Sequence, residues 1–178
     1  VYRNRKFDFE TDRIVKSLYR PFCSQHVYYD RLLNHERSQL PSMFPTPEHR
    51  NIGFYQVGNG SAVPFSVVAT NLLPDLHVTG AGSGGQYFPR FTWAAVSADD
   101  GGLFGEGSVA KQGEASIYGS ISEVVDGYVR VDNITDEFKA FYRDALGADI
   151  TGDDIFHFVY GKLHDPGYRT KYAVSYTH

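Results

Sequence analysis

Hydrophobic and polar residues follow a strand-like pattern through the first two thirds of the chain and a helical pattern in the last third. Short aromatic and β-branched runs that are separated by Gly, Pro and Asn are typical of strands joined by turns. This pattern predicts strands at residues 25–29, 52–57, 65–69, 72–79, 87–93 and 117–131. Between residues 97 and 120 the composition favours a long loop or a ragged hairpin, because apolar anchors are few there.

In the C-terminal part, apolar residues recur three and four positions apart, as in amphipathic helices. The first predicted helix begins after Asn133 or Thr135, either of which can cap it, and ends at Gly147. Its apolar residues are Phe138, Phe141, Tyr142, Ala145 and Leu146. Thr151 caps a second helix that ends before Pro166, and a further turn follows at 168–173.

Strands that precede helices along the chain indicate an α+β fold. We expect an antiparallel or mixed β-sheet region at about 25–131, followed by a C-terminal helical subdomain at about 133–173. At the N-terminus, Thr11 is expected to cap a short helix through Leu18, with Ile14 and Val15 on its apolar face. Pro21 then prevents a helix from continuing, because it fixes its own φ and extends the preceding residue.

The chain length suits one domain over residues 1–178, mainly β with an N-terminal helix at 1–131 and helical at 132–178. A content of 42% hydrophobic and 15% aromatic residues allows a sizeable core and excludes disorder. No apolar run reaches the length of a membrane span. Because the chain begins at Val1 and its one methionine is Met43, we expect a fragment of a longer protein. The lone Cys23 excludes an internal disulfide and indicates a reducing compartment, the cytoplasm.

Charge is distributed unevenly along the chain. The formal net charge is −4, but residues 1–50 hold nine Lys/Arg against six Asp/Glu and residues 51–178 hold eight against fifteen. Because screening makes the field local, an acidic protein can still meet DNA with a basic face. The distribution therefore permits nucleic-acid binding through the N-terminal third.

No catalytic, metal or cofactor motif is predicted in this chain. Gly80, Gly82 and Gly85 match the spacing G-x-G-x-x-G, but a dinucleotide fingerprint must open a helix. Pro89 lies where the first turns of that helix belong, so the run is interpreted as a flexible loop. A phosphate-binding lysine after a glycine loop is absent, which excludes an ATP site of that type.

Several blocks resemble a known family when they are taken in order. They are Tyr19-Arg20-Pro21-Phe22, Tyr28-Tyr29-Asp30-Arg31, a proline-containing segment ending in Phe44-Pro45, Leu76-His77, Phe88-Pro89-Arg90-Phe91, and the block from Asp154 to Arg169. Together they resemble the C-terminal target-recognition (specificity) domain of type ISP restriction-modification enzymes, which are single-chain and ATP-driven. The Leu-Pro-Arg-Ile-Pro-like segment that usually follows in the family is absent, and residues 94–130 match nothing in it.

The resemblance implies a module that reads an asymmetric double-stranded DNA site for other domains of its parent chain. Those domains would be a nuclease, a helicase and an adenine-N6 methyltransferase, with the methyltransferase domain as a direct partner. The parent would use ATP with Mg and S-adenosylmethionine, while this fragment would hold no cofactor and catalyse nothing. Because a specificity domain varies where it reads, the blocks Tyr19–Arg31 and Asp154–Arg169 are interpreted as scaffold.

Candidate DNA contacts follow from side-chain type and predicted loops. For base edges they are Ser83, Gln86 and Arg90 at the glycine loop, Arg50 and Asn51 beside His49 at the exit of the proline segment, and Lys111 and Gln112 in the variable loop. For phosphates they are Arg13, Lys16 and Arg37. The Arg and Tyr residues of Tyr19–Arg31 leave two interpretations open: rings that pack inward beneath guanidinium groups paired with Asp30, or a surface that faces DNA.

Two other classes of function remain open from the residues alone. One is an aromatic-rich β module for a small ligand or saccharide, with Tyr55, Tyr87 and Trp93 as stacking platforms. The other is an enzyme with an unfamiliar site, which opposed pKa shifts of two groups in one cleft would reveal.

Overall fold

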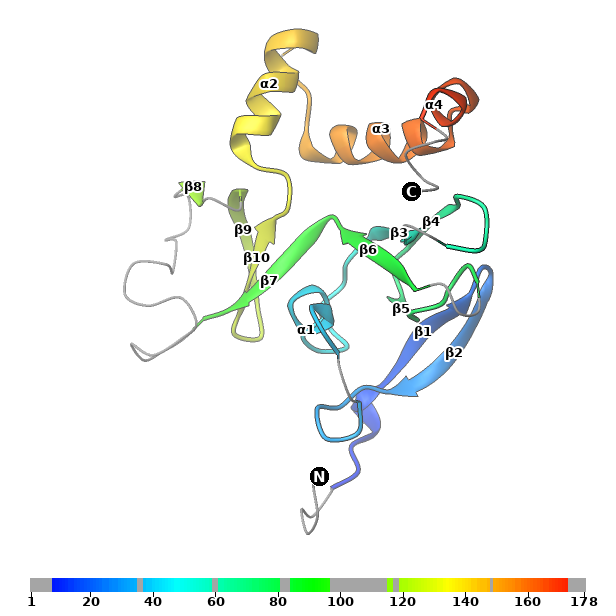
Figure 1. The fold of residues 1–178 in the computed structure, drawn as a ribbon. Helices are drawn as coiled ribbons and strands as arrows, with labels where there is room; N and C mark the ends of the chain where they lie inside the picture. Colours follow the sequence, from blue (N-terminus) through cyan, green and yellow to red (C-terminus); the bar gives the residue numbers. More distant parts are fainter. Residues whose placement is uncertain are drawn as a thin grey trace.

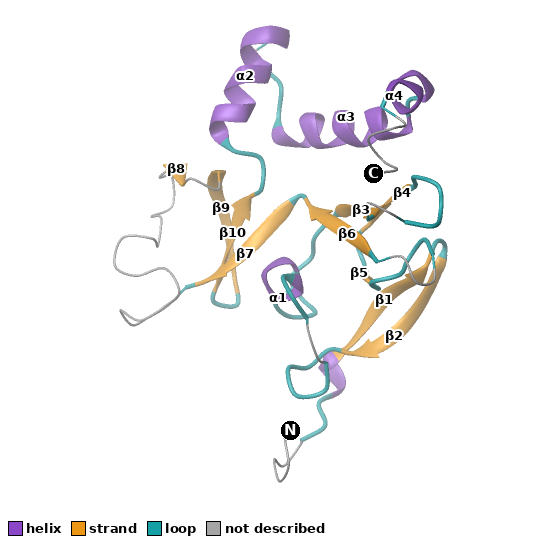
Figure 2. Ribbon diagram, in the orientation of Figure 1, coloured by secondary structure: helices purple, strands orange, loops and turns teal. Residues whose placement is uncertain are grey.

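The computed structural model describes residues 8–34, 37–58, 61–80, 84–96, 115–116, 119–147 and 149–172. Within these ranges, three small sheets occupy the first part of the chain and the longer helices lie at its end (Figures 1 and 2). This arrangement confirms the predicted α+β fold.

The first sheet has the strand order β2-β1-β5, with β2 at its edge. After a three-residue 3₁₀ turn, η1 (Thr11–Arg13), strands β1 (Ile14–Arg20) and β2 (Cys23–Tyr28) form an antiparallel hairpin. The short β5 (Leu73–Pro74) runs parallel to β1. The strand expected at 72–79 thus stops early, since a turn follows in which the Asp75 carboxylate accepts from the His77 amide.

The helix predicted from Thr11 to Leu18 is wrong. Ile14, Val15 and Leu18 satisfy a helical spacing, but β-branched side chains also suit a strand, and the segment pairs with β2 in the register Ile14↔Tyr28. Long-range pairing therefore decides a segment whose local pattern fits both structures.

The second sheet, in the order β4-β3-β6, lies between two layers. Its strands are β3 (Gly53–Val57), β4 (Val67–Thr70) and β6 (Gly85–Pro89). On one face Phe54 packs against Phe156 of helix α3 (Gly152–His164). On the other face Tyr55, 1% exposed, clusters with Leu18 and Val78. The hairpin β1–β2 and helix α3 are thus on opposite sides of this sheet.

The third sheet has the order β7-β10-β9-β8. Its strands are β7 (Phe91–Ala95), β8 (Ala115–Ser116), β9 (Gly119–Val125) and β10 (Tyr128–Asp132). The single strand predicted at 87–93 is wrong, because the chain passes from the second sheet to the third at Arg90. There the Arg90 amide donates to the Ile52 carbonyl, and the Arg90 carbonyl accepts from the Asn133 amide.

The helices confirm the predicted caps. The Thr135 hydroxyl accepts from the Phe138 amide at the start of α2 (Asp136–Leu146), and Gly147, at φ 124°, ends that helix. At α3, Thr151 and Asp154 form a reciprocal capping box. The last helix, α4 (Pro166–Lys171), follows directly, and a one-turn helix α1 (Leu40–Met43) lies between β2 and β3 along the chain. None of the described helices combines the length and the apolar character that crossing a membrane requires.

Helix α2 turns its two phenylalanines and Leu146 outward. Phe138, Phe141 and Leu146 are 47%, 67% and 66% exposed, whereas Lys139 is buried. Lys139 faces inward because its ammonium group binds Asp132 at the end of β10. The apolar periodicity therefore locates the helix correctly, but it does not mark the side that packs on the sheets.

Candidate nucleic-acid interface

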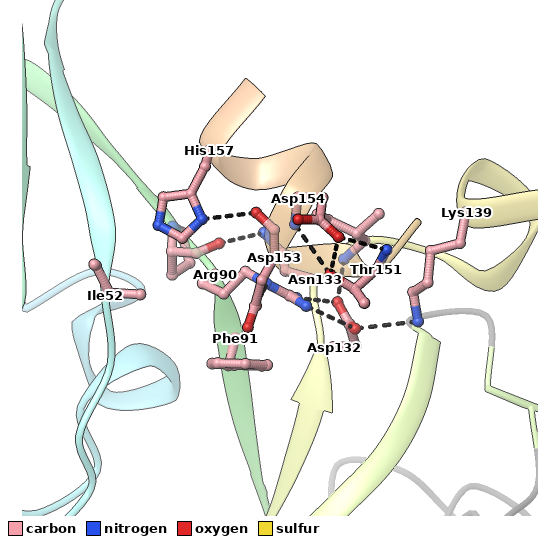
Figure 3. A network of polar contacts seen from close by, with 12 residues as sticks. Ile52, Arg90, Phe91, Asp132, Asn133, Lys139, Thr151, Asp153, Asp154 and His157 are labelled. Carbon is pink, nitrogen blue, oxygen red and sulfur yellow. Dashed lines mark hydrogen bonds and ion pairs between the residues drawn. The ribbon is translucent and has the colours of Figure 1, made fainter. Parts of the chain in front are cut away.

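A buried polar network surrounds Arg90 where two sheets and two helices meet (Figure 3). The Arg90 Nε donates to Asp153 Oδ1 at 2.8 Å, and its Nη1 and Nη2 bind the carboxylate of Asp132. Lys139 Nζ lies 3.1 Å from Asp132 Oδ2. Because Arg90 is 5% exposed, this guanidinium joins the β6–β7 junction to β10 and to the start of α3.

The charges in this network compensate one another. Burial alone would raise the pKa of Asp132, but hydrogen bonds from Arg90, the Ile134 amide and Lys139 outweigh it, and the pKa lies below its ordinary value. Asp132 is therefore held as a carboxylate, and it gives the buried guanidinium its counter-charge.

Two predicted DNA contacts, Arg90 and Asn51, and the neighbouring His49 are buried within the protein. Arg90 is held as described above. The side-chain Nδ2 of Asn51 donates to the backbone carbonyls of Met43 and Phe91, and its Oδ1 accepts from the backbone N–H of Phe91. Asn51 is 5% exposed. His49, 2% exposed, lies 3.0 Å from the Val125 carbonyl and packs edge-on against Trp93. In this conformation neither Arg90 nor Asn51 presents its side chain to a base edge. Proline-rich composition alone indicates a loop but does not show which of its side chains anchor it.

The other predicted contacts divide by accessibility. Arg50, Gln86 and Lys16 are exposed, while Arg13 and Arg37 are half-buried. Arg13 binds the carboxylates of Glu10 and Asp30, and Arg37 lies over the Tyr29 ring at 5.3 Å. Ser83, Lys111 and Gln112 lie outside the described residues.

For the block Tyr19–Arg31, the inward packing of a ring holds at its C-terminal end, but the guanidinium that pairs with Asp30 comes from outside the block. Tyr29 is 8% exposed, in a cluster with Phe44 and Leu73. Asp30 is paired with Arg13, whereas Arg31 is exposed. The Leu32 amide and the Arg13 guanidinium lower the pKa of Asp30, so the pair is charged at neutral pH.

The N-terminal end of the same block has a different character, because it forms an exposed ribbon. From Cys23 to His26 every residue of β2 is exposed, and Lys16 and His26 lie directly opposite each other in the register. No Asp or Glu occurs between Ile14 and Tyr28. Sequence reasoning passed over the polar residues Ser24, Gln25 and His26. The signal that could have found them is a strand with no apolar alternation, which indicates an edge strand open on both faces.

The turn at 75–77 connects the tip of this ribbon to the glycine loop. Arg20 Nη1 donates to the His77 carbonyl at 2.9 Å, and the Gly85 amide donates to the Leu76 carbonyl at 3.0 Å. Gln86, the next residue of β6, is exposed. The turn at 75–77 thus links Gln86, a predicted base contact, to the hairpin β1–β2, part of which is predicted to be scaffold.

The glycine run does not open a helix. Strand β6 begins at Gly85, so the geometry of a dinucleotide site is not formed. Among the described residues, no group of three or more His, Cys, Asp or Glu side chains is placed to hold a metal ion.

The proposed stacking platforms for a saccharide lie inside the protein. Tyr55 and Trp93 are 1% and 6% exposed. Burial raises the pKa of Tyr87, whose hydroxyl donates to the Thr70 carbonyl. A sugar ring could not stack on Tyr55 or Trp93 without opening the core, and Tyr87 is half-buried, so the structure does not favour the saccharide alternative.

The chain is similar in sequence and fold to parts of solved protein–DNA complexes. No curated protein matches the sequence. Solved structures do match, among them a DrdV–DNA complex (30% identity, TM-score 0.70), a nuclease-deletion mutant of the type ISP restriction-modification enzyme LlaGI with a DNA substrate mimic (27%, 0.63), and the ATP-dependent type ISP enzyme LlaBIII bound to DNA (21%, 0.68). They cover 95%, 98% and 98% of this chain, but the chain spans only 13%, 12% and 10% of theirs. The likeness to LlaBIII, at 21% identity, shows the fold alone.

The family assignment covers nearly the whole sequence. Residues 1–176 match the family described as the type ISP C-terminal specificity domain. The blocks that carried the resemblance are thus parts of one continuous match, and the chain belongs to the family of type ISP C-terminal specificity domains.

Proposed function

We propose that this domain recognises a specific double-stranded DNA sequence on behalf of a larger restriction-modification enzyme. The observation that carries the proposal is its similarity, at 30% identity over 95% of the chain, to part of a protein whose structure was determined as a complex with DNA. Family membership supports the same role. The domain itself acts in binding, and catalysis belongs to other parts of the parent enzyme.

The charge distribution supports a particular orientation on DNA. The hairpin β1–β2 carries Lys16, Arg20 and His26 and no carboxylate, whereas the helical segment from Asp136 to Lys171 holds seven Asp/Glu against five Lys/Arg. The hairpin and α3 lie on opposite sides of the second sheet. Phosphates are therefore attracted to the hairpin side and repelled from the helical side.

The proposal extends to the cofactors, the partner domain and the cellular location of the parent enzyme. In the parent, ATP with Mg and S-adenosylmethionine serve domains outside this chain, and the adenine-N6 methyltransferase domain is the intramolecular partner. The acidic rim around the exposed aromatic residues of α2 suits a protein neighbour better than DNA. Action on DNA together with a lone cysteine favours the cytoplasm.

The experiment is selection of bound duplexes from a randomised DNA pool by the 178-residue chain, at low and at moderate salt. Enrichment of one asymmetric motif that persists at the higher salt is the expected result. Retention without sequence preference that disappears with salt would contradict the proposal for this domain alone, because only phosphate attraction would remain.

The salt dependence of binding to the selected motif tests the orientation. If Lys16 contacts a phosphate, Lys16→Met should reduce the slope of log K against log salt by about 0.9. The matched control is Lys162→Met, since Lys162 is 45% exposed on the acidic helical side and should leave the slope unchanged. Equal effects of the two substitutions would refute the orientation.

A further inference from the structure

The turn between β1 and β2 holds an exposed aromatic residue in an unfavourable backbone conformation. Phe22 has φ 63° and is 99% exposed. It follows Pro21 in a turn whose second central position normally takes Gly or Asn, because a side chain is disfavoured at positive φ. An exposed phenylalanine there gains nothing from burial within this domain, so the domain's own folding does not explain the residue.

The base of this turn is fixed. The Arg20 Nη1 donates to the Tyr19 and His77 carbonyls, and its guanidinium lies over the Tyr19 ring at 4.1 Å. The Asp75 amide donates to the Leu18 carbonyl just below the tip. Phe22 is therefore presented from an anchored turn.

The surroundings of Phe22 favour DNA over an apolar protein groove. Within the hairpin the charged side chains are all cationic, the Asp75 carboxylate lies 3.8 Å from Arg20 Nη1, and the exposed residues next to the tip on β2 include Ser24 and Gln25. Strand β1 is bonded on its inner side to β5 and the turn at 75–77, so the side of the hairpin that is open to DNA is the edge strand β2. Aromatic and aliphatic side chains that unstack a base step are a known means by which proteins kink DNA.

We propose that Phe22 is a wedge that inserts into a base step of the bound DNA while the polar edge of β2 faces the groove. The proposal rests on the DNA-recognition function proposed above. A DNA contact is thereby assigned to the block Tyr19–Arg31, which is interpreted from its sequence as scaffold.

The test uses the 178-residue chain with Phe22→Gly and the DNA motif obtained by selection. Glycine relieves the positive φ, so the melting temperature should stay unchanged or rise by up to about 4 °C. Affinity should nevertheless fall about tenfold or more, the range for loss of one stacked aromatic contact. Phe22→Trp should retain tight binding.

A second readout follows the DNA directly. A 2-aminopurine scanned through the motif should become brighter at one step when the wild-type domain binds, and this signal should vanish with Phe22→Gly. Phe141→Ala is the matched control, because it removes an exposed phenylalanine from the acidic helical side. It should leave both affinity and fluorescence unchanged.

The possible results distinguish a failure of the Phe22 wedge proposal from a failure of the DNA-recognition proposal. If Phe22→Gly binds as tightly as wild type with the same fluorescence change, the wedge is refuted and DNA recognition stands. If Phe22→Gly instead lowers the melting temperature by several degrees, the tip is scaffold and the wedge is again refuted. If the wild-type domain enriches no motif, the recognition function and the wedge fail together.

Discussion

Replacing Arg90 by Met should destabilise the fold strongly, because it leaves a buried carboxylate short of its main partner. Arg90 and Asp132 are 5% and 11% exposed at their side chains, so solvent cannot replace the lost hydrogen bonds. Removing one member of a buried pair costs about 3–5 kcal/mol. Lys139 still binds Asp132 at 3.1 Å, and we therefore expect the lower end, about 3 kcal/mol, or a decrease of about 6–12 °C in melting temperature.

The assay is urea unfolding followed by the fluorescence of Trp93, the chain's single tryptophan, which is 6% exposed. Arg50→Met, at an exposed arginine, is the matched control and should change the free energy of unfolding by less than about 0.5 kcal/mol. A cost below about 1 kcal/mol for Arg90→Met would refute the assigned role. If that variant folded normally but altered the selected DNA motif, the result would support the prediction that Arg90 reads a base.

The pH dependence of folding stability gives an independent check on the Arg90–Asp132 ion pair. Because the folded-state pKa of Asp132 is lowered, its contribution to stability is present above the unfolded pKa of about 3.9 and is lost as the pH falls through the folded value. The difference in stability between wild type and Arg90→Met should therefore shrink below about pH 4. A difference that stayed constant would show that Arg90 acts through packing alone.

Two further substitutions test the helical side. A Cβ at Gly152 would fall on the Arg90 guanidinium, so Gly152→Ala should lower the melting temperature; a Cβ at Gly161 meets nothing within 4 Å, so Gly161→Ala should raise stability by about 0.5–1 kcal/mol through helix propensity. An equal gain from both would refute the close approach at Gly152. Phe141 is 67% exposed, so Phe141→Ala should cost less than about 1 kcal/mol in urea unfolding, whereas a loss of 3–5 kcal/mol would mean that the side chain is buried.

Local chemistry predicted the helical part well and the sheets less well. Thr135, Thr151 and Gly147 act within one helical turn, so their capping roles could be predicted from neighbouring residues. Residues 11–18 were predicted to be a helix because three apolar side chains fit its spacing, but pairing with Cys23–Tyr28 makes most of the segment a strand. Such pairing depends on residues that local periodicity does not consider.

In the candidate site, too, contacts between residues far apart in the sequence could not be predicted from local patterns. Gln86 and Arg90 are four residues apart on what the sequence predicts as a loop running into one strand, and both have the chemistry to read a base. The chain changes sheets at Arg90 and buries its guanidinium against Asp132, which is 42 residues away, while Gln86 stays exposed. The distant carboxylate, and not the arginine's own neighbourhood, decides between structure and contact.

A family motif can likewise combine both roles within ten residues. In the block Tyr19–Arg31, Tyr29 is 8% exposed in a core cluster and Phe22 is 99% exposed at positive φ. Both are aromatic, and residue type alone would assign both to the core. What separates them is the backbone: Pro21 and a fixed turn direct Phe22 away from the domain, where only a partner can cover it. A recurring motif in a recognition domain therefore does not by itself mark scaffold, and the strained, exposed position within it is the one to test against DNA.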